Sequence, residues 1–507
     1  MELECADSQA LLLAAHSFDD RVNSKTSGTT NHQPNSTMNS PDSTSSFKNA
    51  SKVDTSLQRH HHDNLFTYLL GINIAVVIFL ALAFGLPNVS NLYFTIHPSA
   101  SSHGIKLFSI VILTSVLATF LSFLWMEVLQ RHALHVLSAT VRVSILVCLA
   151  LGTISFFDAG VGGRAIGFFN IFSAFFLFLY YMSSRPSMAF ASSNLRLGVQ
   201  ILQKFPQVFY FTGKVVLVQG IWTVIWLGGV LGILSMLTYR LHDANGYGYA
   251  AIFFLLLSYY WAAQVCKNVV HCVVAGTVGE WWYGSSNSES VSRAKVRTLS
   301  TSFGSVCLGS LIVAVLSTIR TFFDLFPRRG GRQSANACLD WIITVVMHHA
   351  QYFNKFAFCH VAMYGSSLGK AGTDTFALLR NRGWTALVND SLISNVLSVG
   401  CLLVGLLSGG IGASWLYLTL NCTQTEAALH PEECETFSVV ILSFVICSTT
   451  AFAISSTISS VLESVVITVF ICFAEDPAVF ERYHPREHLE LVTAWSTYKP
   501  DLFLQSV

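Results

Sequence analysis

The chain has 507 residues, of which 52% are hydrophobic and only 11% are charged, and its formal net charge is +1. A soluble protein needs roughly 25% charged residues to keep its surface hydrated, so this composition excludes a soluble globular protein. The near-zero net charge also gives no electrostatic reason to expect a nucleic-acid partner. The composition is typical of a protein that meets lipid over most of its surface.

The N-terminal segment, residues 1–63, differs from the rest of the chain. Between Asn23 and Ser56 it is rich in Ser, Thr and Asn and nearly lacks large apolar residues. Such a segment cannot bury enough apolar surface to offset the entropy lost on ordering. We predict a disordered tail here and place it in the cytoplasm.

Apolar runs long enough for about 20 residues of helix recur from Leu65 onward. We expect about ten transmembrane helices within residues 64–474, followed by a cytoplasmic C-terminal tail, residues 475–507. These runs are too long and too continuously apolar for transmembrane strands, so the predicted fold class is an all-α polytopic membrane protein. The predicted spans are Leu65–Leu86, Ile105–Leu129, Arg142–Phe157, Ala165–Met182, Lys214–Leu237, Tyr247–His271, Ser302–Phe323, Trp341–Tyr364, Ala386–Leu418 and Phe437–Phe473. Trp341–Tyr364 is the most polar of them, and either crossing the membrane or lying on it fits its sequence.

The distribution of Lys and Arg places both termini in the cytoplasm, because loops on that side carry more positive charge. Asn88 and Asn421 then lie in outer loops, and each starts a glycosylation acceptor pattern. Cys422 and Cys434 share the second of these loops, where an oxidising compartment would let them form a disulfide.

The chain carries no motif of an enzyme: it has no phosphate-binding loop, dinucleotide fingerprint, zinc-protease motif or nucleophile elbow. We therefore predict no catalytic residues, no cofactor and no metal site. Asp390 is interpreted as a helix cap near the start of a span, with ion coupling as the alternative.

The most informative stretch has two aromatic clusters. Tyr259, Tyr260 and Trp261 form the first cluster, and the second, Trp281, Trp282 and Tyr283, directly follows Glu280. Aromatic faces and a carboxylate are what a quaternary ammonium requires, since it has no N–H to donate. Two clusters one bilayer apart also fit aromatic belts at the membrane interfaces. Spacing alone favours the belts, and the cation site remains the competing hypothesis.

Several segments resemble the choline-transporter-like family, in particular its fungal plasma-membrane branch of pH-nine-sensitive type proteins. They follow in the family's order from about Tyr259 to His488. The segments are QVCKNVVHCVVAGTVGEWWY, TSFGSVCLGSLIVAVLSTIR, YFNKFAFCHVAMYG, RNRGWTALVNDSLISNVL and CFAEDPAVFERYHPREH. The resemblance implies ten transmembrane helices, cytoplasmic termini and a solute-carrier role. It also implies that the family's aromatic-rich central helix corresponds to the two clusters. With this resemblance, the cation-site hypothesis and the aromatic-belt hypothesis are equally supported.

The prediction from residues and resemblance together is a plasma-membrane solute carrier for choline or a related small organic cation. Its partners would be the lipid bilayer and that substrate. The alternative is a non-transporting scaffold or lipid-handling protein, in which the aromatic clusters are only interface anchors.

Overall fold

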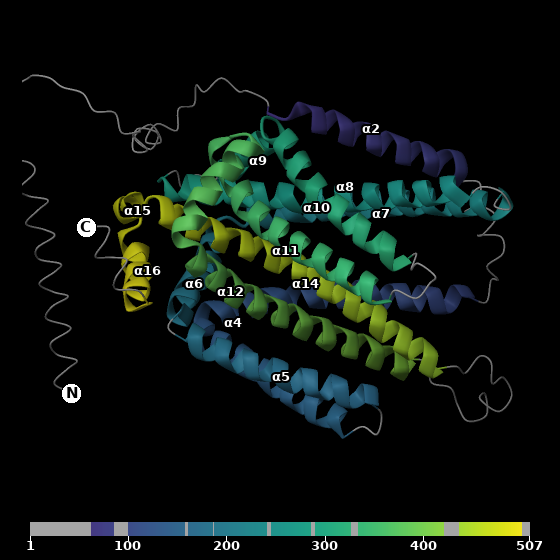
Figure 1. Ribbon diagram of the computed structural model, residues 1–507, viewed down its shortest axis with the longest axis horizontal. Coiled ribbons are helices and arrows are strands. Elements are labelled where there is room, and N and C mark those ends of the chain that lie inside the picture. The colour runs from purple at the N-terminus through teal and green to yellow at the C-terminus, as the bar shows by residue number, and fades with distance from the viewer. Residues whose placement is uncertain are drawn as a thin grey trace, which may run out of the picture. The chain divides into compact units, whose positions relative to one another are not determined.

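The computed structural model describes residues 62–85, 100–157, 161–185, 187–240, 245–284, 289–325, 333–419 and 436–498. Every regular element in these ranges is helical, which confirms the all-α prediction (Figure 1). The elements are α2 (Asn64–Leu80), the π-helix η1 (Ala81–Gly85), α4 (Ala100–Phe156), α5 (Val161–Ser184), α6 (Ser187–Lys204), α7 (Gln207–Arg240), α8 (Asn245–Trp282), α9 (Ser290–Leu299), α10 (Phe303–Leu325), α11 (Gln333–Tyr364), α12 (Leu368–Thr419), α14 (Thr436–Glu475), α15 (Pro477–Tyr483) and α16 (Pro485–Tyr498).

Within the described residues, eight helical segments are long and apolar enough to cross a bilayer. Large apolar side chains are exposed on their outer faces. Examples are Phe169 and Val224, whose exposed fractions are 68% and 69%. Water would not tolerate such a surface over whole helices, so lipid must cover it. The protein is therefore a multi-pass membrane protein. The predicted number of ten spans is not confirmed, because α11 is not among these eight segments and α4 forms a single one.

Helix α4 joins two predicted spans that we expected a loop to separate. The helix continues from Ala100 to Phe156, and its backbone leaves helical geometry at His132, where φ is −127° and ψ is 27°. Arg131, expected in the connecting loop, instead forms an ion pair with Glu127 one turn earlier, at 2.7 Å. The residues around His132 include no proline or glycine that would end the helix, so the chain bends without unwinding.

Helix α5 packs mainly against the second half of α4. The two helices cross closely at Gly152 and Gly167: a Cβ on Gly167 would lie 2.6 Å from the backbone nitrogen of Phe156. Small residues at such a crossing let the backbones approach, as in many membrane helix pairs.

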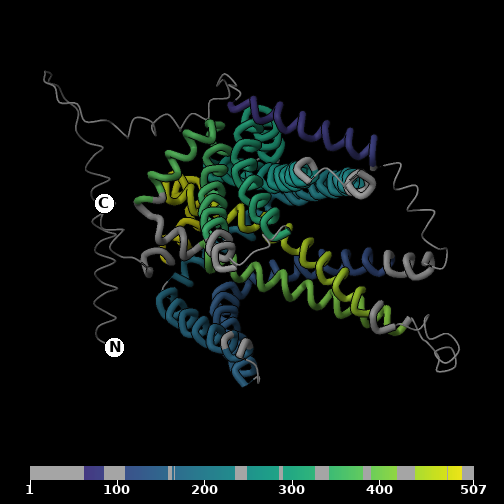
Figure 2. Tube along the Cα trace, turned by 45° about the vertical axis from the view of Figure 1, so that its right-hand side comes forward, coloured from purple at the N-terminus to yellow at the C-terminus, as the bar shows by residue number. Residues whose placement is uncertain are grey.

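Helix α14 lies in the interior of the bundle. Within its most apolar window 78% of the residues are buried, against 11% for α5. It lies beside α12 (Figures 1 and 2) and also contacts α4, α6, α8 and α11. A helix surrounded by protein can carry polar groups, because neighbouring helices rather than lipid meet them.

Helix α11 includes the predicted Trp341–Tyr364 segment and packs against α8, α10, α12 and α14. Its polar side chains therefore have protein partners available. The tail residues 1–61, the acceptor residues Asn88 and Asn421, and the cysteines Cys422 and Cys434 all lie outside the described residues. The predictions made for them stay predictions.

Candidate functional site

A cavity of about 340 Å³ lies between four helices, α7, α8, α12 and α14. This volume is within the range of small-molecule sites. Its lining combines hydroxyl, thiol, amide and charged groups with aliphatic side chains and one aromatic ring. The lining residues are Thr212, Val215, Val216, Gln219, Ala263, Cys266, Lys267, Val270, Ser394, Leu397, Ser398, Cys401, Phe452, Ser456, Thr457, Ser459, Ser460 and Glu463.

The hydroxyl groups of the lining explain how a polar cavity exists among apolar spans. Thr212 and Thr457 each donate to the carbonyl four residues earlier, at 2.9 Å. Their donors are thus satisfied within the helix, while the oxygen lone pairs remain able to accept. Gln219 also lines the cavity, and its side-chain oxygen, which is buried, has no hydrogen-bond partner among the described residues. The cavity wall therefore offers acceptors to water or a ligand.

A charged cluster borders the cavity at Glu463. Lys355 on α11 donates to the Glu463 carboxylate at 2.6 Å, and its ammonium lies 3.6 Å from the carboxylate of Asp390 on α12. All three side chains are at most 28% exposed. With both carboxylates ionised, two carboxylates against one ammonium give this triad a formal net charge of −1. A net charge in the membrane interior is costly and marks a functional site.

His271 fixes α8 against the two helices that carry Lys355 and Glu463. Its Nε2 lies 2.8 Å from the backbone oxygen of Lys355, and its Nδ1 lies 2.7 Å from the hydroxyl of Ser464. A carbonyl oxygen can only accept, so Nε2 donates to Lys355. The Ser464 hydroxyl donates to the backbone oxygen of Ser460 at 2.8 Å, and its oxygen lies beside Nδ1. Both ring nitrogens are thus used, and His271 positions the triad beside the cavity.

The first aromatic cluster lies near the middle of α8 and forms specific contacts there. The indole of Trp261 donates to the backbone oxygen of Cys307 at 3.0 Å. The Tyr260 hydroxyl lies 2.8 Å from that of Thr321, and the ring of Tyr259 lies 4.7 Å from that of Trp226. These contacts attach α8 to α7 and α10.

The second aromatic cluster lies about 30 Å away, since 20 residues of helix separate Trp261 from Trp281. One small cation cannot touch both clusters. Trp282 stacks on Phe480 of α15 at 4.0 Å, and Trp281 stacks on His484 at the same distance. Both indoles are fully buried. The Tyr283 hydroxyl lies 3.2 Å from that of Tyr364.

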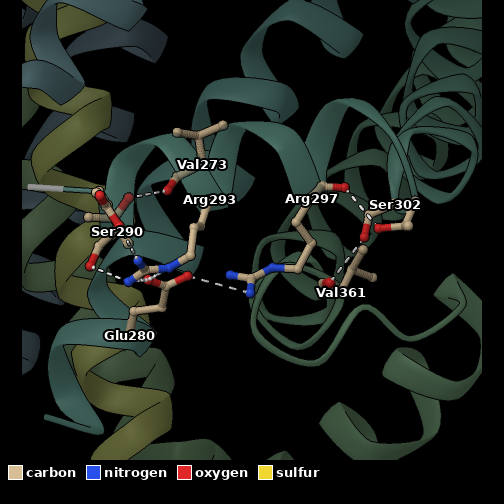
Figure 3. A network of polar contacts seen from close by, with 10 residues as sticks. Val273, Glu280, Ser290, Arg293, Arg297, Ser302 and Val361 are labelled. Carbon is tan, nitrogen blue, oxygen red and sulfur yellow. Dashed lines mark hydrogen bonds and ion pairs between the residues drawn. The ribbon is translucent and has the colours of Figure 1, made fainter. Parts of the chain in front are cut away.

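Glu280 is held by two arginines of α9 (Figure 3). Arg293 donates twice to one carboxylate oxygen, at 2.8 and 3.1 Å, and Arg297 lies 3.6 Å from the other oxygen. Burial lowers the pKa of Arg297, and the Glu280 carboxylate counteracts this shift. Arg297 also anchors the next turn, because its backbone oxygen accepts from the amide of Ser302 at 3.2 Å. Binding of a cation by the seven predicted residues stays a prediction, and their observed contacts are with other parts of the protein.

Sequence reasoning missed the triad. Asp390 lies inside the continuous helix α12, 22 residues after its start at Leu368, so the interpretation as a helix cap was wrong. No residue between Leu368 and Asp390 is a proline, and the glycines there do not end the helix. Glu463 is a single carboxylate in a long apolar run, and that isolation was the signal that could have identified it.

The fold and the cavity define a class: an all-helical, multi-pass membrane protein with a polar, charged cavity between its spans. Residues 168–478, more than half of the chain, match the family described as "Plasma-membrane choline transporter". The chain belongs to this choline-transporter-like family, which is a family of transporters and not of enzymes.

Relatives of known name are similar over most of the chain. A protein named PNS1 from Debaryomyces hansenii is 26% identical over 408 residues, which cover 75% of each chain. A CTL-like protein from Dictyostelium discoideum is 24% identical over 442 residues, covering 84% of this chain and 74% of the relative. The PNS1 protein of Saccharomyces cerevisiae is 26% identical over 355 residues, 64% of this chain and 63% of that protein.

Proposed function

We propose that the chain is a solute carrier that moves a small organic cation of the choline class across the plasma membrane, with the cavity as its binding site. The observation that carries this proposal is the net negative triad of Lys355, Asp390 and Glu463 at the edge of a polar cavity. The match to a family of choline transporters supports the substrate class.

The cavity suits an organic ammonium ion for two reasons. Glu463 supplies a carboxylate, and with Asp390 it gives the triad two carboxylates against the single ammonium of Lys355. The ring of Phe452 and the aliphatic lining can contact methyl groups, which a quaternary ammonium presents in place of N–H donors. Hydroxyl oxygens of the lining can accept from an alcohol group on the substrate.

The test is uptake of labelled choline by the purified chain in proteoliposomes. We expect saturable uptake, and we expect Glu463→Gln to weaken the apparent affinity about tenfold, the effect of roughly 1.4 kcal/mol. Glu127→Gln is the matched control, because Glu127 forms an exposed pair with Arg131 on α4 and does not line the cavity. Thermal stability of each variant separates lost binding from lost folding.

Absence of saturable uptake over a panel of choline-like amines would refute the carrier proposal and favour the scaffold or lipid-handling alternative. Equal loss of affinity in the Glu463 and Glu127 variants would refute the assignment of the cavity. The plasma-membrane location is checked separately, by labelling surface proteins of intact cells with an impermeant reagent and detecting the tagged chain among them.

A further inference from the structure

Lys267 is a second charge in the wall of the cavity, and it comes from α8. Its side chain is exposed, and among the described residues it has no ion-pair partner within 4 Å. It lies near the middle of the span Gly248–Trp282. An ammonium ion at that depth requires water or a counter-charge, so the cavity must be hydrated or must hold an anionic group there.

Among the described residues, the nearest counter-charge to Lys267 is the carboxylate of Glu463 on α14, which lies within electrostatic range but forms no direct ion pair with it. Glu463 also lines the cavity, and one of its two carboxylate oxygens accepts from Lys355 at 2.6 Å. Asp390 faces Lys355 as well, at 3.6 Å. The cavity wall therefore carries a positive pole, Lys267 on α8, and a negative pole, the triad on α11, α12 and α14, and no ion pair within 4 Å joins the two among the described residues.

Such a pair of poles discriminates between ligands of different charge. A simple cation is attracted by the triad but repelled by Lys267. A simple anion is attracted by Lys267 but repelled by the triad. A molecule with both charges gains at both ends, because each of its charges meets the opposite sign in the cavity wall.

We propose that the preferred ligand of this cavity is a zwitterion, a small ammonium carboxylate whose cationic end lies at Glu463 and whose carboxylate lies at Lys267. This inference rests on the proposed function and names its substrate class more narrowly. Serine and threonine hydroxyls of α12 and α14 line the space between the poles and solvate the middle of the ligand.

Choline and glycine betaine form the natural probe pair, since they share a trimethylammonium group and differ in a hydroxymethyl against a carboxylate. Uptake of each labelled compound is measured with the full chain in proteoliposomes. We expect glycine betaine to bind about tenfold more tightly than choline in the unmodified chain.

Lys267→Met is the decisive variant, because it keeps the length of the side chain and removes the charge. We expect it to weaken the binding of glycine betaine and to strengthen the binding of choline, so that the ratio of the two affinities changes at least tenfold. Lys214→Met is the control, since Lys214 is an exposed lysine of α7 that does not line the cavity. It should leave the ratio unchanged.

The outcomes separate this inference from the proposed function. Saturable choline uptake with no competition by glycine betaine would overturn the zwitterion and leave the carrier standing. An unchanged affinity ratio in Lys267→Met, with normal thermal stability, would overturn it as well. Failure of both compounds and of other choline-like amines would remove the carrier proposal itself, and the zwitterion with it.

Discussion

Helix α8 carries charged and aromatic groups at two places that are built in opposite ways. At its α9 end, Glu280 meets two arginines and the indoles of Trp281 and Trp282 are stacked on other rings. Near its middle, Lys267 faces a cavity and has no ion-pair partner among the described residues. Charged and aromatic side chains that are paired with other parts of the protein stabilise the fold. A charged side chain that lines a cavity without an ion-pair partner is available to a ligand.

The residues that stand out in the sequence are not the ones that line the cavity. The aromatic clusters stand out in the sequence, yet in the structure they connect α8 to α7, α10 and α15. The cavity is lined mostly by Ser, Thr and Val, which are common in membrane helices and attract no attention one at a time. If the comparison is correct, variants at the α9 end should change stability, and variants at the cavity should change binding.

The largest effect is expected for Trp282→Ala. The substitution removes a fully buried indole and its stack on Phe480, so unfolding should become easier by about 3–5 kcal/mol. Trp282→Phe keeps an aromatic face and should recover part of the loss. Thermal unfolding in detergent measures both. Unchanged stability together with weaker cation binding would contradict a purely structural role for Trp282 and would support the predicted site at this cluster.

A smaller loss is expected for Lys355→Met. It leaves Glu463 and Asp390 without their shared ammonium, which should destabilise the fold by about 2–3 kcal/mol, below the value for fully buried pairs because the groups are partly exposed. Adding Glu463→Gln should restore much of that stability. A double-mutant cycle in thermal unfolding checks this, and strictly additive effects would show that the pair is not coupled.

The smallest effect is expected for Glu280→Gln, which sharpens the contrast with Glu463. Arg293 is 42% exposed and can be solvated, so we expect a loss of only about 1–2 kcal/mol in stability. Choline affinity should stay unchanged, because the carboxylate is occupied by Arg293 and Arg297. Calorimetric titration of the purified variant measures that affinity. A selective loss of cation binding would instead place the carboxylate of Glu280 in a binding site.

The sequence alone determined the fold class. Continuous apolar runs make helices that meet lipid, and this depends on local hydropathy that any window of about 20 residues reveals. Segments such as YFNKFAFCHVAMYG also carried the family, because they are contiguous in the chain. The sequence did not reveal that the chain stays helical through His132, since a bend and a short loop can have the same hydropathy.

The tertiary structure alone decided where charges meet. Lys355 and Glu463 are 108 residues apart and form one ion pair only because α11 and α14 pack together. In the sequence, nothing distinguishes Lys267 from the other polar residues of its segment. Only the packing of α7, α12 and α14 around α8 places it in the wall of a cavity. Pairing and empty space depend on the packing of helices distant in sequence, so no local pattern records them.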